Sequence, residues 1–217
     1  MSLIDKIKET FTTPISVSYK EKKEYSKLDM IVLNPVFLFL LVASMTWSAW
    51  DVSRPKTSAV ADAALSNAMV YFEQGDFDNA VLQLESVVEN HKGTSSANQA
   101  KFYLGRTAFI NGNHDKAIVL LSECAGKLKY STLKTEAYIM LGQLDSDLDS
   151  ALKFFNKAQK NALSENEITY ISILKAKRLT MEGKKAEALE ILDQIDTENN
   201  TYEELFEEVY GVALTLN

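Results

Sequence analysis

The stretch "FYLGRTAFINGNHDKA" (residues 102–117) joins the end of one apolar helical pattern to the start of another through a polar turn that contains glycine. Gly105 and Ala117 stand twelve residues apart on the two sides of that turn. Leu121 and Cys124 follow Ala117 by four and seven residues, which places all three on one face of the second helix. The stretch therefore predicts two helices that pack closely, because small residues meet at their contact.

Three further segments repeat this pattern. The alanines near the start of each second helix are spaced 37, 34 and 37 residues apart: Ala80, Ala117, Ala151 and Ala188. The residues four and seven positions later are again apolar: Leu84, Leu121, Phe155 and Leu192, then Val87, Cys124, Ala158 and Ile195. Small residues stand twelve positions before three of the alanines: Ala68, Gly105 and Ala176. In the third segment Gly142 precedes Ala151 by only nine residues, so we expect a turn about three residues shorter there.

This spacing resembles the tetratricopeptide repeat (TPR), a helix–turn–helix unit of about 34 residues. The resemblance covers residues 61 to about 196, although no unit ends in the proline that is usual in the family. It implies an all-α fold, a right-handed solenoid of about four helix pairs within a domain spanning residues 61–217. Stacked pairs bury a continuous core that no single pair could form, and they leave one long concave surface.

The C-terminal stretch "TYEELFEEVYGVALTL" (residues 201–216) has the pattern of one amphipathic helix. Four glutamates lie on one face of this helix. The apolar side chains share another face: Tyr202, Leu205, Phe206, Val209 and Ala213. A helix with one apolar face covers the exposed edge of a repeat stack. Residues 201–216 are therefore predicted to be a capping helix.

In TPR proteins the first helix of each pair lines the concave surface. By this resemblance we expect partner-contacting side chains in the second and fourth units: Gln99, Phe102, Arg106, Phe109, Tyr170, Ile173 and Lys177. Arg106 and Lys177 are the candidates for electrostatic selection of a partner protein. The alternative is that some of these side chains only pack against neighbouring helices. The Lys/Asn clamp with which TPR co-chaperones bind acidic C-termini is not recognisable.

The stretch "LNPVFLFLLVASMTWSAW" (residues 33–50) contains no charge, and the uncharged run extends over residues 30–50. A helix of that length spans about 30 Å, the thickness of the hydrocarbon core of a bilayer. Trp47 and Trp50 stand at its far end, where amphipathic rings favour the membrane interface. Residues 30–50 are therefore predicted to be one transmembrane helix, which would contact the lipid bilayer.

The charges that flank this run predict its orientation. Only Arg54 and Lys56 lie close after the run. Four lysines lie close before it: Lys20, Lys22, Lys23 and Lys27. Because positive charges stay inside, we expect residues 1–29 to be a cytoplasmic tail, residues 51–60 a linker, and the helical domain to be periplasmic. The expected location is the inner membrane of a cell, with a single pass. The inverted topology, with the domain in the cytoplasm, is the alternative.

Two other interpretations of the apolar run stay open. The first is a cleaved signal peptide, but its polar lead-in would be long and no A-x-A sequence follows the run. The second is a buried core helix, although the sequence offers no equally apolar partner downstream. Span length and flanking charge favour the transmembrane interpretation over both.

Composition limits the function classes. The net charge is −7, and residues 51–217 carry most of it, which argues against nucleic acid as a partner. Cys124 is the single cysteine, so a cysteine-rich metal site and an intrachain disulfide are excluded. We found no catalytic motif and no spacing of metal ligands, and the triple-aspartate stretch "DSDLDS" lacks the glycine and glutamate of a calcium loop. The sequence predicts a protein that is not an enzyme and that binds no cofactor and no metal.

The order of span, linker, repeats and cap resembles the membrane-anchored TPR proteins of the YfgM type. That resemblance implies an adaptor that accompanies the bacterial Sec translocon and passes exported proteins to periplasmic chaperones. Its expected partners are proteins: translocon subunits, exported chaperones or envelope assembly factors. The alternative is a structural subunit or scaffold of a larger membrane or cell-envelope complex, in which the concave surface has no free ligand.

Overall fold

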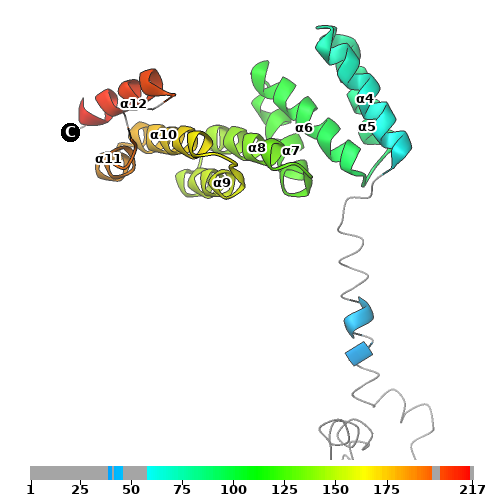
Figure 1. Ribbon diagram of the computed structural model, residues 1–217, viewed down its shortest axis with the longest axis horizontal. Coiled ribbons are helices and arrows are strands. Elements are labelled where there is room, and N and C mark those ends of the chain that lie inside the picture. Colours follow the sequence, from blue (N-terminus) through cyan, green and yellow to red (C-terminus); the bar gives the residue numbers. More distant parts are fainter. Residues whose placement is uncertain (1–38, 41, 46–57, 197–200, 216–217) are drawn as a thin grey trace, which may run out of the picture. The chain divides into compact units, whose positions relative to one another are not determined.

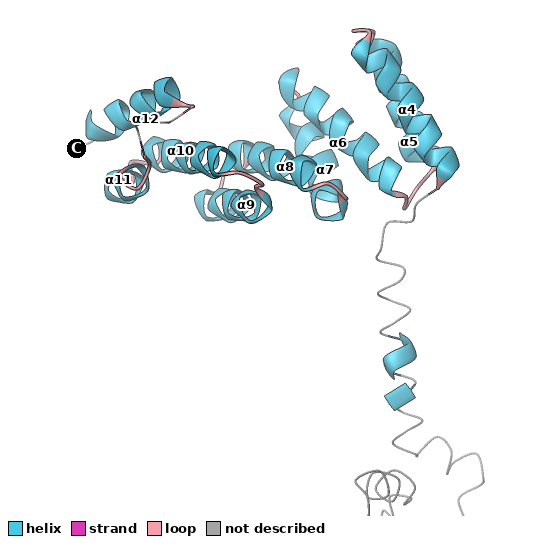
Figure 2. Ribbon diagram, in the orientation of Figure 1, coloured by secondary structure: helices cyan, strands magenta, loops and turns pink. Residues whose placement is uncertain are grey.

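The computed structural model describes residues 39–40, 42–45, 58–196 and 201–215. The chain divides after Arg54 into two parts, which are described separately. Of the first part, only residues 39–40 and 42–45 are described, and they are helical. The second part contains the packed helices that Figures 1 and 2 label.

Every regular element among residues 58–196 and 201–215 is a helix. In chain order the helices are α4 (Ala59–Glu73), α5 (Phe77–Asn90), α6 (Ser95–Ile110), α7 (His114–Cys124), the 3₁₀ helix η1 (Ala125–Lys127), α8 (Ser131–Leu144), α9 (Leu148–Asn161), α10 (Glu165–Met181), α11 (Lys185–Leu192) and α12 (Glu203–Thr215). The all-α prediction is confirmed for this part of the chain.

The first helix begins earlier than expected. Ser58 is the N-cap of α4, and its side chain accepts a hydrogen bond from the Ala61 N–H at 3.5 Å. A cap of this kind satisfies an amide that would otherwise lack a partner at the helix start. The predicted linker at residues 51–60 therefore overlaps the folded domain by its last residues, and its remainder, residues 51–57, lies outside the described residues.

Consecutive helices form four pairs, here called units 1 to 4: α4–α5, α6–α7, α8–α9 and α10–α11. Three residues join the two helices of each pair. In units 1, 2 and 4 the middle residue is a glycine with a positive φ of 71–77°: Gly75, Gly112 and Gly183. In unit 2, Gly112 donates to Phe109 O at 3.1 Å and Asn113 donates to Ala108 O at 2.8 Å. This pair of bonds closes a helix end and needs the left-handed conformation that glycine adopts freely.

Unit 3 departs from this pattern. Its turn keeps three residues, and α8 ends two residues after Gly142, whereas α6 ends five residues after Gly105. The prediction of a shortened turn is therefore wrong, because the missing residues come from the end of α8. Ser146 replaces the turn glycine, and the Asp147 carboxylate caps α9 by accepting from the Ser150 N–H at 2.8 Å.

Small residues set the distance between paired helices, as the sequence predicts. A Cβ atom on Gly105 would lie 2.8 Å from Leu121 Cγ, and one on Gly142 would lie 2.9 Å from the Phe155 ring. The repeated alanines of the second helices have no exposed surface: Ala80, Ala117, Ala151 and Ala188. Interiors at this density leave no room for an added methyl group. The predicted small-residue contacts therefore form the core of each unit.

Each unit packs on the next, which extends the core along the domain. The first helix of units 2, 3 and 4 contacts both helices of the preceding unit, and α12 contacts α10 and α11 in the same way. Phe206, Val209 and Ala213 of α12 are buried in one cluster with Ile173 and Leu192 of unit 4. The helix predicted at residues 201–216 is therefore present as α12, and it covers one side of unit 4.

The predicted transmembrane helix lies outside the described residues, except for residues 39–40 and 42–45. Among the residues that the structure describes, no helix has both the length and the apolar character needed to cross a bilayer. The predicted tail at residues 1–29 also lies outside the described residues.

Candidate functional site

The first helices of successive units carry ion pairs across their junctions. We call the surface that carries Gln99 and Arg106 on α6 and Tyr170 and Lys177 on α10 the first-helix surface. Arg106 Nε on α6 lies 2.9 Å from Glu136 Oε1 on α8, and Lys177 Nζ on α10 lies 3.0 Å from Glu208 Oε1 on α12. All four side chains are between 39 and 58% exposed. The two cations that the sequence singled out are therefore each paired with a carboxylate of the next helix in the stack, which the sequence analysis missed.

Aromatic and polar side chains lie beside these ion pairs. Tyr170 is half-buried, and its ring centroid lies 4.8 Å from that of Tyr202. Burial raises the pKa of Tyr170, Tyr202 raises it further, and Lys177 lowers it. The phenol is protonated at neutral pH and can donate a hydrogen bond. Gln99 is also half-buried on α6, so it presents part of its amide at the surface.

Phe102 and Ile173 belong to the core instead. Neither has any exposed surface, so neither can contact a partner while the domain is folded. Phe102 is buried in one cluster with residues of α8, and Ile173 is buried in one cluster with residues of α12. Each stands three residues before the small residue of its helix, at a position that the next helix in the stack covers. Phe109 is half-buried and packs against the same cluster as Phe102.

The comparison with protein families supports the repeat. Residues 65–124 match the family model of the tetratricopeptide repeat. This segment carries the TPR pattern. It covers most of unit 1 and all of unit 2, and units 3 and 4 repeat the same helix pairing in the structure. No curated protein and no solved structure was found to match the chain.

A TPR domain indicates a protein–protein interaction role, and no catalytic family was found. Within residues 58–196 and 201–215, His, Cys, Asp and Glu side chains form no group of three that could hold a metal ion. Burial raises the pKa of the Cys124 thiol to about 12, so the thiol stays protonated and unreactive at neutral pH. Cys124 is a packed core residue, as its repeat position predicts.

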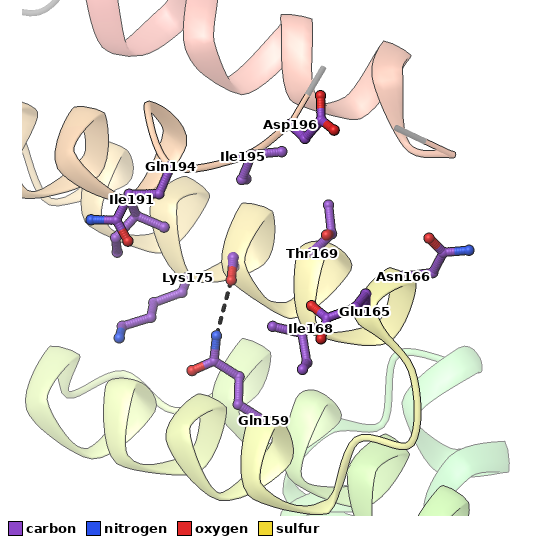
Figure 3. Close-up of a pocket in the computed structure, with 11 residues that line it drawn as sticks. Gln159, Glu165, Asn166, Ile168, Thr169, Lys175, Ile191, Gln194, Ile195 and Asp196 are labelled. Atoms are coloured by element: carbon purple, nitrogen blue, oxygen red, sulfur yellow. Dashed lines mark hydrogen bonds between the residues drawn. The ribbon is translucent and has the colours of Figure 1, made fainter. Parts of the chain in front are cut away.

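A cleft of about 650 Å³ lies between α9, α10 and α11 (Figure 3). Its lining combines three isoleucines with uncharged polar side chains and a few charges: Ile168, Ile191, Ile195, Gln159, Thr169, Ser172, Gln194, Asn166, Lys175, Glu165 and Asp196. Gln159 Nε2 donates to Ser172 Oγ at 2.9 Å and links α9 to α10. Ile195 lines the cleft because α11 ends at Leu192, three residues before it. The sequence pattern placed Ile195 on the apolar face of the second helix; it lies beyond the end of α11, is half-buried, and packs against the core cluster of unit 4 as well.

A second, smaller groove lies in units 1 and 2. It has a volume of about 480 Å³, and its lining comes from α5, α6, α7 and the turn before α7. Val81, Leu82 and Leu104 provide apolar surface, while Asp78 and Lys116 provide charges. Lys116 Nζ also lies 3.3 Å from Glu85 Oε1 of α5. Repeat spacing alone predicts neither groove, because both depend on the lengths of individual side chains.

Proposed function

We propose that the helix-pair domain is a docking module that residues 30–50 tether to a membrane, and that it assists protein export or envelope protein quality control. The observation that carries this proposal is the TPR match over residues 65–124, because such repeats present surfaces to other proteins. The uncharged run of 21 residues supports the tether, and the lysines before it favour a periplasmic domain. The proposed partners are translocon subunits and exported chaperones.

The first-helix surface is the proposed docking site. Its ion pairs neutralise Arg106 and Lys177, so a partner carboxylate would have to displace Glu136 or Glu208. Those exposed glutamates are accessible to a basic group of the partner at the same time. Exchange of exposed ion pairs costs little, because each contributes only about 0–1 kcal/mol. The surface can therefore select partners by charge pattern without a large penalty in stability.

The test is purification of the full chain in mild detergent from bacterial membranes, with photoreactive side chains at Gln99 and Tyr170. We expect crosslinks to translocon subunits or exported chaperones, and a loss of these crosslinks in the Arg106→Glu/Lys177→Glu variant. The matched control is Lys92→Glu/Lys129→Glu, which reverses two exposed charges elsewhere. Recovery of neither partner class would contradict the proposal, whereas a stable stoichiometric complex would favour a structural subunit.

The proposed topology has a separate test. We expect external protease to digest the domain in intact spheroplasts, because the lysine bias favours a domain outside the cytoplasm. A domain that protease reaches only after lysis would show the inverted topology. Extraction of the chain from vesicles by alkaline carbonate would contradict the transmembrane tether.

A further inference from the structure

The cleft between α9, α10 and α11 lies where unit 4 lacks a pair of charged side chains that unit 2 has. Units 2 and 4 align with an offset of 71 residues, which places Ala176 on Gly105 and Ala188 on Ala117. With that offset Ser172 corresponds to Lys101 and Gln194 corresponds to Glu123. In unit 2 these positions form an ion pair between Lys101 and Glu123, which joins α6 to the end of α7.

Ser172 and Gln194 carry no charges and cannot form that ion pair. Ser172 instead accepts a hydrogen bond from Gln159, and Gln194 lines the far wall of the cleft (Figure 3). In unit 2 the chain also continues from α7 into η1, whereas α11 of unit 4 ends at Leu192. Ser172 is shorter than Lys101, and Gln194 has the length of Glu123 but no charge. In unit 4 these two differences and the early end of α11 leave the space without the ion pair that crosses it in unit 2.

The cleft has the dimensions of a short extended peptide. It runs along α10 from Glu165 to Lys175, which is about 15 Å at the helical rise of about 1.5 Å per residue. An extended chain covers about 3.3 Å per residue, so four or five residues fit that length. The volume of about 650 Å³ lies within the range that ligand sites occupy.

The chemistry of the lining favours a particular peptide. Figure 3 shows Lys175 at one end of the cleft, and Glu165 and Asn166 at the other. Lys175 Nζ donates to the neutral Asn156 amide oxygen at 3.0 Å, and a carboxylate would be a stronger acceptor for it. Between the two ends, Ile168 and Ile195 offer apolar contact.

Polar side chains along the cleft complete the match to a polypeptide. Thr169, Gln159 and Gln194 carry hydroxyl and amide groups that can both donate and accept hydrogen bonds. A peptide backbone requires such partners when it leaves water. We propose that the cleft binds an extended segment of a partner protein that carries an acidic side chain near Lys175 and an aliphatic side chain between Ile168 and Ile195. This proposal does not depend on docking at the first-helix surface.

The probe is a phage-displayed library of random heptapeptides, selected on the full chain in detergent. We expect enriched peptides to share one acidic and one aliphatic residue. Binding of a fluorescent selected peptide should weaken at least tenfold in Ser172→Lys/Gln194→Glu, which installs the ion pair of unit 2 in the cleft. The matched control is Ser66→Lys/Gln83→Glu, which makes the same substitutions at exposed positions of unit 1 and should leave the affinity unchanged.

Lys175→Gln is the second variant, and it leaves the apolar lining of the cleft intact. It should weaken the selected acidic peptide at least fivefold, but it should not weaken the same peptide with its acid replaced by an amide. Equal binding to the wild type and to Ser172→Lys/Gln194→Glu would overturn the proposal, as would the absence of enriched peptides. Loss of binding only in Arg106→Glu/Lys177→Glu would also overturn it, while leaving the proposed function intact.

Discussion

Unit 2 and unit 4 share one backbone pattern, but their side chains differ at two places. At each place a side chain of one unit bridges to a neighbouring element, and the equivalent side chain of the other unit lines a groove. In unit 2 the Lys101–Glu123 ion pair joins the two helices, and the equivalent Ser172 and Gln194 of unit 4 line a cleft. The reverse holds near the other end of the first helix. Thr107 of unit 2 lines the smaller groove, whereas the equivalent Arg178 of unit 4 reaches across and donates to Ser146 O at 2.8 Å.

This reciprocity separates two roles of the repeat. The small and apolar positions that set helix packing are kept in both units, with Leu121 and Leu192 both fully buried. The positions between paired helices vary in length and charge, and they decide where a groove opens. A repeat protein can therefore change its binding surfaces by exchanging exposed side chains without altering its core.

The largest expected effect tests whether Phe102 and Ile173 are equivalent core positions. Phe102→Ala should lower the free energy of unfolding by about 3–5 kcal/mol, and Ile173→Ala by about 2–5 kcal/mol, because each leaves a cavity. Urea unfolding measured by circular dichroism checks both values. Ile110→Ala, at a side chain that is 68% exposed, is the control and should change stability by less than about 0.5 kcal/mol. An equally small effect at Phe102 would restore it as a surface residue.

The second effect concerns the groove that Arg178 fills. Arg178→Thr removes the hydrogen bond to Ser146 O and the ion pair with Glu182, whose atoms lie 3.0 Å apart. Hydrogen bonds from charged groups contribute about 1.5–3 kcal/mol, so we expect a loss of that size in urea unfolding. The reciprocal Thr107→Arg should be tolerated, because its groove is open. A larger loss in Thr107→Arg than in Arg178→Thr would contradict the comparison.

The third effect concerns the small residues of the two first helices. Gly105→Ala should destabilise the domain by about 1–3 kcal/mol, because the added methyl group would collide with Leu121. Ala176→Gly should cost only about 0.5–1 kcal/mol, from the greater freedom of the unfolded chain. Gly211→Ala on α12 is the control, since nothing lies within 4 Å of its added Cβ, and it should increase stability. Thermal melting of the three variants checks the order.

The fourth effect is a pH dependence that unit 4 lacks, because Ile195 replaces Cys124 there. Burial raises the Cys124 pKa from about 9 to about 12, so the unfolded chain loses this proton first as pH rises. The contribution of this thiol is unaffected below about pH 9, and stability then falls by about 1.4 kcal/mol per pH unit toward pH 12. Cys124→Ala should lack this component in urea unfolding at pH 8, 9 and 10. Identical slopes for the two proteins would show that the thiol is not buried.

The smallest effect compares the two ion pairs of the first-helix surface. Double-mutant cycles at Arg106–Glu136 and Lys177–Glu208 should each give a coupling energy of about 0.2–1 kcal/mol, because the side chains are well exposed. Both couplings should shrink at high salt, where exposed charges are screened. A coupling above about 2 kcal/mol at either site would mean that this pair holds the stack together.

The sequence predicted the helix pairs because a small residue and a buried alanine recur at nearly constant spacing, as at Gly105 and Ala117. The sequence could not show that Phe102 is buried while Arg106 is exposed. Both residues lie on α6, and the difference arises because the next helix in the stack covers Phe102. The sequence placed the missing residues of unit 3 in the turn, whereas the turn keeps three residues, Asp147 within it caps α9, and α8 is the shorter element. The cleft was missed because it depends on a pair of residues 22 positions apart in the chain, Ser172 and Gln194.

Within residues 58–196 and 201–215, each first helix makes its main contacts with its own partner and with the helices directly before and after its unit. The two ends of the domain are therefore weakly coupled in energy. The effects of substitutions in α4 and in α12 on the free energy of unfolding should be additive. Substitutions that alter the cleft beside α10 should therefore leave the stability and the surface of unit 1 unchanged.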